Sequence, residues 1–306
     1  MAAIAAAADV PPLAGNIQVS VGRGELPTAM MSHPSGASCE VILTGAHVTS
    51  WKTKDGVERL FVSSASEFGN GAAIRGGIPV CWPQFSGRGT LPKHGFLRTS
   101  SEWEIAEMSS EGGECKLVLS MSDSEATRAV WPHKFEVRYV VILSADGLGT
   151  EFEVVNHGDA ELTFTAALHT YFDVSDVAGC TVTGLDGLTY EDNAAGGTTA
   201  QEVQPELKIL GEVDRVYLDA PETISLHYPK SGGRLRVHKS ASFRDVVVWN
   251  LGEAKAPGMS DLGAGEWQRY LCLEAGAVGT PVTLAPGAAF KGTQAFVCDA
   301  PECDAE

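Results

Sequence analysis

Residues 135–143 read FEVRYVVIL, and this run decides the fold class of the chain. Its odd-numbered positions are all apolar, from Phe135 to Leu143, whereas Glu136 and Arg138 lie between them. Successive side chains of a β-strand point to opposite faces of a sheet, so an alternation with period two buries one face only. The run therefore predicts a half-buried β-strand.

The same alternation recurs along most of the chain. Further strand-like runs occupy residues 115–121, 151–155, 161–168, 245–250, 269–274 and 289–297. Turn dipeptides such as Asp146-Gly147 and Pro286-Gly287 separate these runs at spacings that favour antiparallel hairpins. We therefore expect an all-β protein, built as a large antiparallel β-sandwich with one core.

Helical periodicity is confined to one short segment, residues 123–130. Asp123 or Ser124 is suited to cap its first turn, and Pro132 is expected to stop it. It is the only helix that the sequence predicts.

The chain divides into one domain and two short ends. Residues 1–15, MAAIAAAADVPPLAG, are rich in small residues and contain no Lys or Arg, so they predict a disordered leader, with a poorly formed organelle signal as the alternative. Residues 301–306 form an acidic tail. Residues 16–300 then form a single β-sandwich domain, in which residues 194–204 and 253–265 are expected to be surface loops.

The composition predicts a soluble globular protein that binds neither nucleic acid nor membrane. Of 306 residues, 44% are hydrophobic and 20% are charged, and the net charge is -17. Affinity for a polyanion comes largely from Lys and Arg, which are outnumbered here by Asp and Glu. No apolar run approaches the roughly 20 residues that a membrane-spanning helix needs. We expect the chain to act as a monomer.

The cysteines indicate a reducing compartment. Their number, seven, is odd, and none of them forms a C-x-x-C pair, so we expect free thiols. This favours the cytoplasm, or an organelle stroma, over a secreted location. Cys298 and Cys303 flank the acidic tail, but no histidine or second cysteine pair lies near them, and we expect no metal site there.

Positive charge is concentrated in residues 73–98, AIRGGIPVCWPQFSGRGTLPKHGFLR. The surrounding residues 69–101 contain no Asp or Glu, where the average content of the chain predicts about four. A cationic loop on an acidic protein is suited to hold a small anion, and the arginine fork matches phosphate or carboxylate oxygens. The alternative is a solubilising loop that is basic by chance. The four candidate anion ligands are Arg75, Arg88, Lys93 and Arg98.

Three separated motifs resemble those of the glucose-6-phosphate 1-epimerases, the hexose-6-phosphate mutarotase branch of the aldose 1-epimerase family. They are IRGGIPVCWPQF followed by HGFLR within residues 74–98, ALHTYFDV at residues 167–174, and WQRYLCLEAG at residues 267–276. They occur in the expected order over about two thirds of the chain. The resemblance implies a galactose-mutarotase-like supersandwich whose concave sheet face carries the sugar site.

The resemblance also implies the reaction, which is interconversion of the α and β anomers of hexose 6-phosphates, chiefly glucose 6-phosphate. A proton must leave the C1 hydroxyl and another must reach the ring oxygen; the open-chain aldehyde then rotates and the ring recloses. One acid and one base suffice for these transfers, so we expect no cofactor and no metal ion. The expected partner is a small sugar phosphate.

Two catalytic residues follow from the resemblance. Glu274 matches the base, and we expect it to protrude from the end of an apolar strand, just before a glycine turn. An ordinary glutamate pKa of about 4.3 would leave it ionised at neutral pH. His169 matches the acid, because imidazole gives and takes a proton near neutrality. We expect these two groups to face each other across a gap the size of a pyranose ring.

The resemblance also implies five residues that bind the substrate. Arg75 and Arg98 match phosphate contacts, and Lys93 replaces the glutamine that is common before HGF in the family. His94 matches a histidine that contacts the sugar near its ring oxygen or C1 hydroxyl. Asp214 matches an aspartate that accepts hydrogen bonds from sugar hydroxyls, which suits a group that only accepts.

Two other functions remain open at this point. A mutarotase for unphosphorylated aldoses would gain little from the three cations Arg75, Lys93 and Arg98, so loss of Arg98 distinguishes the two substrates. A sugar-binding β-sandwich without catalysis would bind its ligand and leave the rate of anomer exchange unchanged, because the fold alone does not imply turnover.

Overall fold

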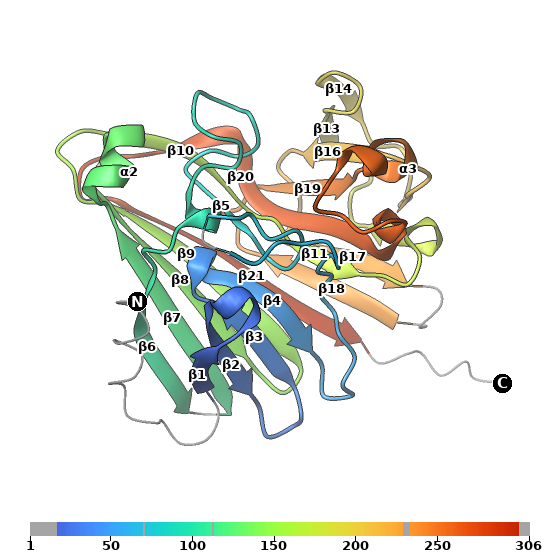
Figure 1. Ribbon diagram of the computed structural model, residues 1–306. Helices are drawn as coiled ribbons and strands as arrows, with labels where there is room; N and C mark the ends of the chain where they lie inside the picture. Colours follow the sequence, from blue (N-terminus) through green and yellow to red (C-terminus); the bar gives the residue numbers. More distant parts are fainter. Residues whose placement is uncertain (1–16, 70, 112, 229–232, 300–306) are drawn as a thin grey trace.

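The computed structural model describes residues 17–69, 71–111, 113–228 and 233–299 of the chain (Figure 1). The disordered leader predicted for residues 1–15 and the tail of residues 301–306 lie outside these ranges.

Three sheets build the described part of the molecule, and every pairing between their named strands is antiparallel. The smallest sheet has four strands in sequence order. Its strands are β1 (Ile17–Val21), β2 (Pro27–Ser32), β3 (Ser38–Ile42) and β4 (His47–Lys52).

The largest sheet has nine strands in the order β15-β12-β17-β18-β21-β9-β8-β7-β6. Its strands are β6 (Glu104–Glu111), β7 (Glu114–Ser122), β8 (Phe135–Leu143), β9 (Gly147–Asn156), β12 (Thr181–Thr183), β15 (Glu206–Lys208), β17 (Thr223–Tyr228), β18 (Gly233–Lys239) and β21 (Ala289–Asp299).

The third sheet carries the site described below. It has eight strands in the order β14-β13-β16-β19-β20-β10-β5, with β11 also paired to β20. Its strands are β5 (Val80–Cys81), β10 (Leu162–Leu168), β11 (Tyr171–Asp173), β13 (Thr189–Asp192), β14 (Thr198–Gln201), β16 (Val213–Tyr217), β19 (Asp245–Asn250) and β20 (Tyr270–Leu284).

The two α-helices among the described residues are short. α2 (Glu125–Val130) confirms the predicted helix, and Ser124 is its N-cap, because its side chain and that of Thr127 each accept from the other's backbone N–H. α3 (Gly252–Lys255) was not predicted and lies beside β19 (Figure 1). No helix among the described residues has the length and apolarity needed to cross a bilayer.

Six 3-10 turns complete the regular structure of the described residues. They are η1 (Arg23–Glu25), η2 (Thr44–Ala46), η3 (Leu97–Thr99), η4 (Val177–Gly179), η5 (Ala256–Gly258) and η6 (Glu266–Arg269). Both segments expected to be loops therefore contain regular structure, since β14 lies within residues 194–204, and α3 and η5 overlap residues 253–265.

The alternation in β8 confirms the predicted sandwich. Its odd-numbered side chains, from Phe135 to Leu143, are completely buried, while Glu136 and Arg138 are only partly covered. Trp82 packs edge-on against Phe135 with ring centroids 4.8 Å apart, so it belongs to the core. Burial of each large apolar side chain stabilises the fold by about 1.5–3 kcal/mol.

β20 differs from the prediction. It was expected to end at Glu274 before a turn at Gly276, but it continues to Leu284. The reason is that Gly276 pairs with Ala167 of β10 on one side and with Asp245 of β19 on the other, so the backbone stays extended between two neighbours. Glu274 consequently lies inside a long central strand.

Candidate active site

One cavity of about 260 Å³ brings together all seven residues that the sequence predicts for the site. Strands of the eight-stranded sheet form its floor, and the loops around residues 85–98 and 251–259 form its walls. The residues that line it are Arg75, Phe85, Ser86, Lys93, His94, Arg98, His169, Glu212, Asp214, Val247, Trp249, Leu251, Lys255, Met259 and Glu274. Its size suits a small molecule rather than a polymer.

Glu274 lies on the floor of the cavity, on β20, where it pairs with Val247 of β19. Its neighbours Leu273 and Ala275 point into the core, so the strand directs Glu274 to the opposite face. Its exposed fraction is only 1%. Burial, and to a smaller extent the charge of Asp214, raise the pKa of Glu274 well above its usual value. The carboxyl group therefore does not have the ordinary pKa that was expected from sequence.

His169 immediately follows β10, and its backbone N–H donates to the carbonyl oxygen of Pro79 at 3.0 Å. Its ring stacks on that of Tyr171, nearly parallel and 4.7 Å away, and meets the edge of Trp249. Burial lowers the pKa of His169 well below its usual value, and the nearby His94, Arg75 and Arg98 contribute in the same direction. The ring is therefore fixed in orientation and favours its neutral form.

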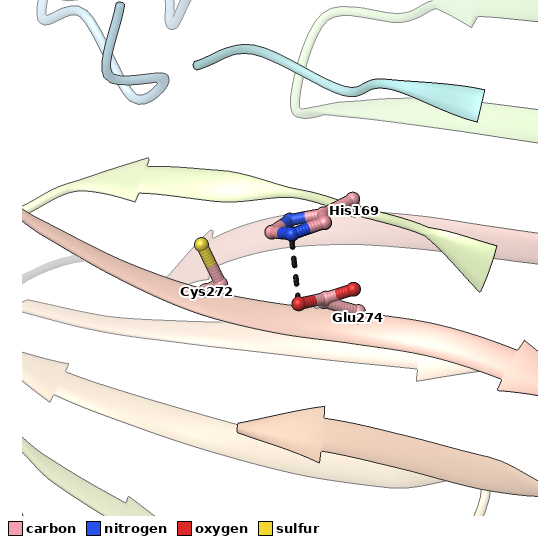
Figure 2. Close-up of side chains that lie close together, drawn as sticks. All are labelled: His169, Cys272 and Glu274. Carbon is pink, nitrogen blue, oxygen red and sulfur yellow. Dashed lines mark ion pairs between the residues drawn. The ribbon is translucent and has the colours of Figure 1, made fainter. Parts of the chain in front are cut away.

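The acid and base are closer together than expected. Nδ1 of His169 lies 3.3 Å from Oε1 of Glu274 (Figure 2). The prediction that a gap the size of a pyranose ring separates the two groups is therefore wrong. The difference is compatible with the chemistry, because the C1 hydroxyl and the ring oxygen are bonded to the same carbon. Two groups side by side on the cavity floor can therefore exchange protons with both oxygens.

His94 is a neutral donor in this site. The backbone N–H of Ser86 donates to its Nδ1 at 3.3 Å, which leaves Nε2 to carry the proton of the neutral ring. Burial, assisted by the charges of Arg98, Lys93 and Arg75, lowers the pKa of His94 to about 3. The ring therefore stays neutral at physiological pH and is suited to donate a hydrogen bond to a sugar oxygen.

The loop that carries His94 is tightly constrained. His94 has a φ of 67° and Gly95 a φ of 69°, a region that side chains other than glycine rarely adopt. A Cβ atom on Gly95 would lie 2.0 Å from the carbonyl oxygen of Trp82. The glycine is thus required by the close approach of two backbone segments, which fixes where His94 enters the cavity.

Arg75 is not a free anion ligand. Its Nε and Nη2 donate to the carboxylate of Asp261 at 3.1 and 2.9 Å, and its Nη1 donates to the hydroxyl of Tyr171 at 3.0 Å. Burial opposes the charge of Arg75, but Tyr171 and Asp261 outweigh it and raise the pKa of the guanidinium. Arg75 lines the cavity as part of this hydrogen-bonded group.

Arg98 and Lys93 are the cations with the most free hydrogen-bonding capacity. Nη2 of Arg98 donates to the carbonyl oxygen of Lys93 at 3.1 Å, and its buried Nε makes no hydrogen bond with any described residue. Neither side chain forms an ion pair within the described part of the chain. A guanidinium and an ammonium in this state are suited to bind phosphate oxygens.

Asp214 lies on β16, opposite Trp249 of β19. Its Oδ1 accepts a hydrogen bond from Nδ2 of Asn193 at 2.7 Å. Burial raises the pKa of Asp214, although this hydrogen bond opposes the shift. Arg88, the weaker phosphate candidate, pairs with Glu191 and does not line the cavity.

The sequence analysis missed several residues of the site. Lys255 and Glu212 form an ion pair at the wall of the cavity, and Trp249 and Asp261 contact the predicted residues. No motif marked Lys255 or Asp261, because both lie in the segment expected to be a surface loop. Trp249 stood in a predicted strand, but the face to which it points was not evident.

A set of possible metal ligands includes two residues that line the cavity, His169 and Glu274, and one that does not, Cys272. Among the described residues, the side chains of His169, Cys272 and Glu274 are the ones close enough together to hold an ion. Anomer interconversion by an acid and a base does not require an ion at this position.

The sequence of this chain is similar to those of known proteins. The family model for aldose 1-epimerase matches residues 27–297. A protein of Cenchrus ciliaris that bears the name "Putative glucose-6-phosphate 1-epimerase" is 37% identical over 83% of this chain and 79% of its own length. A protein of the same name from Salmonella typhimurium is 32% identical over 82% of this chain and 83% of its own.

Solved structures show the same fold. The crystal structure of a "putative mutarotase (YeaD)" from Salmonella typhimurium superposes with a TM-score of 0.84 at 27% identity, covering 95% of both chains. Galactose 1-epimerase from Lactobacillus acidophilus superposes with a TM-score of 0.70 at 15% identity, covering 93% of this chain and 98% of that one, and this likeness concerns the fold alone. The match over residues 27–297 and these relatives at 37% and 32% identity show that the chain belongs to the aldose 1-epimerase family.

Proposed function

We propose that this protein interconverts the α and β anomers of a hexose 6-phosphate, chiefly glucose 6-phosphate. One observation carries the proposal, namely that a single cavity holds a buried imidazole–carboxylate pair on its floor and two cations on its wall that pair with no carboxylate of the described residues. The pair supplies acid–base chemistry, and the cations supply a place for the phosphate.

The mechanism needs one proton on the pair formed by His169 and Glu274. Burial favours the neutral arrangement, in which the proton resides on the carboxyl group. Transfer across the 3.3 Å contact produces an imidazolium acid and a carboxylate base. Glu274 then takes the proton of the C1 hydroxyl while His169 gives its proton to the ring oxygen. The bond between C1 and the ring oxygen breaks, and its electron pair stays on that oxygen.

Reclosure reverses the roles of the two groups. After rotation about the C1–C2 bond, the hydroxyl on C5 attacks the other face of the aldehyde. His169 takes back the proton of this hydroxyl, and Glu274 returns a proton to the aldehyde oxygen. The neutral ring of His94 can donate a hydrogen bond to a sugar oxygen, and Asp214 can accept hydrogen bonds from hydroxyl groups, so both orient the sugar. No oxidation or reduction occurs.

Charge supports a phosphorylated substrate over a neutral sugar. The whole protein has a net charge of -17 and would repel an anion, yet Lys93 and Arg98 present unpaired positive charge to the cavity. A neutral aldose offers no group that compensates these cations. The relatives at 37% and 32% identity described above bear names that specify glucose 6-phosphate.

The proposal is tested by following the anomeric proton signals of freshly dissolved α-glucose 6-phosphate and, separately, α-glucose. We expect the protein to accelerate anomer exchange of the phosphorylated sugar. We expect Arg98→Ala to lower kcat/KM for glucose 6-phosphate at least about tenfold and to change kcat/KM for glucose little. Arg88→Ala is the matched control, because Arg88 is paired with Glu191 outside the cavity. Equal losses for both sugars would favour an unphosphorylated substrate, and no acceleration of either would indicate a sugar-binding protein.

The cellular setting is part of the proposal. The free thiols of the described cysteines support a reducing compartment, the cytoplasm or an organelle stroma. That the enzyme acts as a monomer stays a prediction from the sequence.

A further inference from the structure

The floor of the cavity offers a second kind of chemistry. Nδ1 or Nε2 of His169, Sγ of Cys272 and a carboxylate oxygen of Glu274 all lie within 4.8 Å of one another (Figure 2). We propose that these three side chains bind a thiophilic divalent cation, with Zn²⁺ as the best fit, and that the bound ion reversibly inhibits the enzyme. The binding stands on geometry alone, whereas the inhibition rests on the proposed function.

The spacing of the first two ligands already suits zinc. A tetrahedral zinc ion with bonds of about 2.0–2.2 Å to nitrogen and oxygen needs those two atoms roughly 3.3–3.5 Å apart. Nδ1 of His169 and Oε1 of Glu274 are 3.3 Å apart. Since the thiol of Cys272 lies within 4.8 Å of both side chains, closing a bond of about 2.3 Å to sulfur requires a shift on the order of 1 Å.

The donor atoms are also free to coordinate. All three side chains are at least nine-tenths buried, and Cys272 is a free thiol. Nδ1 of His169 and Oε2 of Glu274 make no hydrogen bond with any described residue. A buried polar atom without a hydrogen-bond partner destabilises the protein. An ion that coordinates such atoms removes this penalty, which favours binding.

The kinds of donor select the ion. A thiolate and an imidazole favour zinc and related metals over Mg²⁺ and Ca²⁺, which prefer oxygen ligands. A thiolate and a carboxylate together balance the two positive charges of the ion. Arg75, one of the guanidinium groups that act on His169, is already paired with Asp261, which limits its repulsion of a cation.

The site has the features of an inhibitory site rather than a structural one. β20 is hydrogen-bonded to β19 on one side and to β10 and β11 on the other, so the strand that carries Cys272 and Glu274 does not depend on an ion for its shape. Three protein ligands leave a fourth position for water or a sugar oxygen. A bound ion would engage the nitrogen of the acid and an oxygen of the base, which blocks proton transfer between them.

Cys272 separates metal binding from catalysis. It lies two residues before Glu274 on the same strand and does not line the cavity. Its replacement by serine keeps the size of the side chain and removes the thiolate. Cys81 is the matched control, because it is a completely buried cysteine of the same sheet, on strand β5 beyond β10, that is absent from the ligand group.

The experiment measures Zn²⁺ binding to the purified, chelator-treated protein by isothermal titration, and Co²⁺ binding by the absorption band of a thiolate–cobalt bond. We expect one zinc ion per chain, a thiolate–cobalt band, and loss of anomer exchange that is restored by a chelator. We expect Cys272→Ser and Cys272→Ala to weaken zinc binding at least about tenfold and to abolish the cobalt band. Without zinc, both variants should exchange anomers at the parent rate. Cys81→Ala should behave as the parent in all three measurements.

The outcomes separate this inference from the proposed function. Zinc affinity and a cobalt band that are unchanged in both Cys272 variants would overturn the metal site, as would a parent protein that binds no zinc. A parent protein that binds zinc through Cys272 but never exchanges anomers would support the site and overturn the proposed function. Thermal unfolding of each variant, compared with Cys81→Ala, shows that a loss of binding is not a loss of folding.

Discussion

Arg75 and Asp261 form a two-point ion pair at the wall of the cavity, with Nε and Nη2 of the arginine 3.1 and 2.9 Å from Oδ2 of the aspartate. The pair joins the RGG motif to the segment of residues 253–265, which is far away in sequence. It also explains why Arg75 differs from Arg98: one guanidinium is held by a carboxylate, and the other is free to receive a phosphate.

This relationship predicts that Asp261 positions Arg75 without contacting the substrate. Asp261→Asn removes the charge that holds the guanidinium, and we expect kcat/KM for glucose 6-phosphate to fall about tenfold, which corresponds to the roughly 1.4 kcal/mol of one charge-assisted hydrogen bond. Steady-state anomerisation rates measure the change. The control is Asp146→Asn, because Asp146 pairs with Lys54 on the exposed surface. Equal effects of the two substitutions would contradict the assignment.

His94 is expected to act as a neutral hydrogen-bond donor. His94→Ala removes the Nε2–H group, and we expect kcat/KM to fall about ten- to a hundredfold, whereas His94→Gln keeps an N–H donor and loses less. Because the pKa of His94 is about 3, the histidine stays neutral between pH 5.5 and pH 8, and the loss caused by alanine should be the same at both values. A loss that changes with a midpoint near pH 6.5 would show that His94 acts as a proton donor instead.

Gly95 is predicted to be indispensable for folding. In Gly95→Ala the new Cβ atom would lie 2.0 Å from the carbonyl oxygen of Trp82 at a positive φ, and we expect the free energy of unfolding to fall by about 3 kcal/mol or more. Gly56→Ala is the matched control, because Gly56 also has a positive φ but has open space around its Cβ position, so we expect a loss of about 1 kcal/mol. Denaturant unfolding measures both. Equal losses would contradict the predicted clash.

His47 is expected to make stability depend on pH. It is completely buried, its Nε2–H donates to the carbonyl oxygen of Gly76 at 2.7 Å, and burial lowers its pKa to about 4. The unfolded chain, with an ordinary histidine pKa near 6.5, binds this proton more readily than the folded one. Its contribution is therefore fully present above pH 6.5 and is lost as the pH falls towards 4, by about 3 kcal/mol.

The check is the free energy of unfolding of the parent and of His47→Gln between pH 7.5 and pH 4.5. Glutamine keeps a donor for Gly76 and does not titrate, so we expect the variant to show a shallower decline in stability over this range. Parallel curves for the two proteins would mean that His47 does not bind a proton on unfolding. The comparison uses the slopes, because the substitution also changes packing.

The all-β class of the fold was predictable because the alternation of apolar and polar residues is visible within a single short strand. β8 begins and ends at the residues that its alternation indicated, and the cap of α2 follows from Ser124. The course of β20 was not predictable in the same way. Gly276 reads locally as a turn, and only its pairing with two neighbouring strands keeps it extended.

The site was predictable to the extent that motifs marked it. His169 and Glu274 could be named from three motifs, but their 3.3 Å separation depends on how β10 and β20 pair. The pairing of Arg75 with Asp261 and the entry of Lys255 into the cavity depend on how the segment 253–265 folds over the sheet, which no local pattern records. The pKa shifts have the same origin, since burial is a property of the assembled cavity.

The account stands on His169 and Glu274 as one acid–base pair acting on one sugar carbon. The most direct measurement is the rate of exchange between the α and β anomeric protons of glucose 6-phosphate at equilibrium, by magnetisation transfer, for the parent, His169→Ala, Glu274→Gln and the control Glu212→Gln from the cavity wall. We expect each of the first two substitutions to lower the catalysed rate by about 10²- to 10⁴-fold and the control to change it little. Exchange at the parent rate in both His169→Ala and Glu274→Gln would contradict the account.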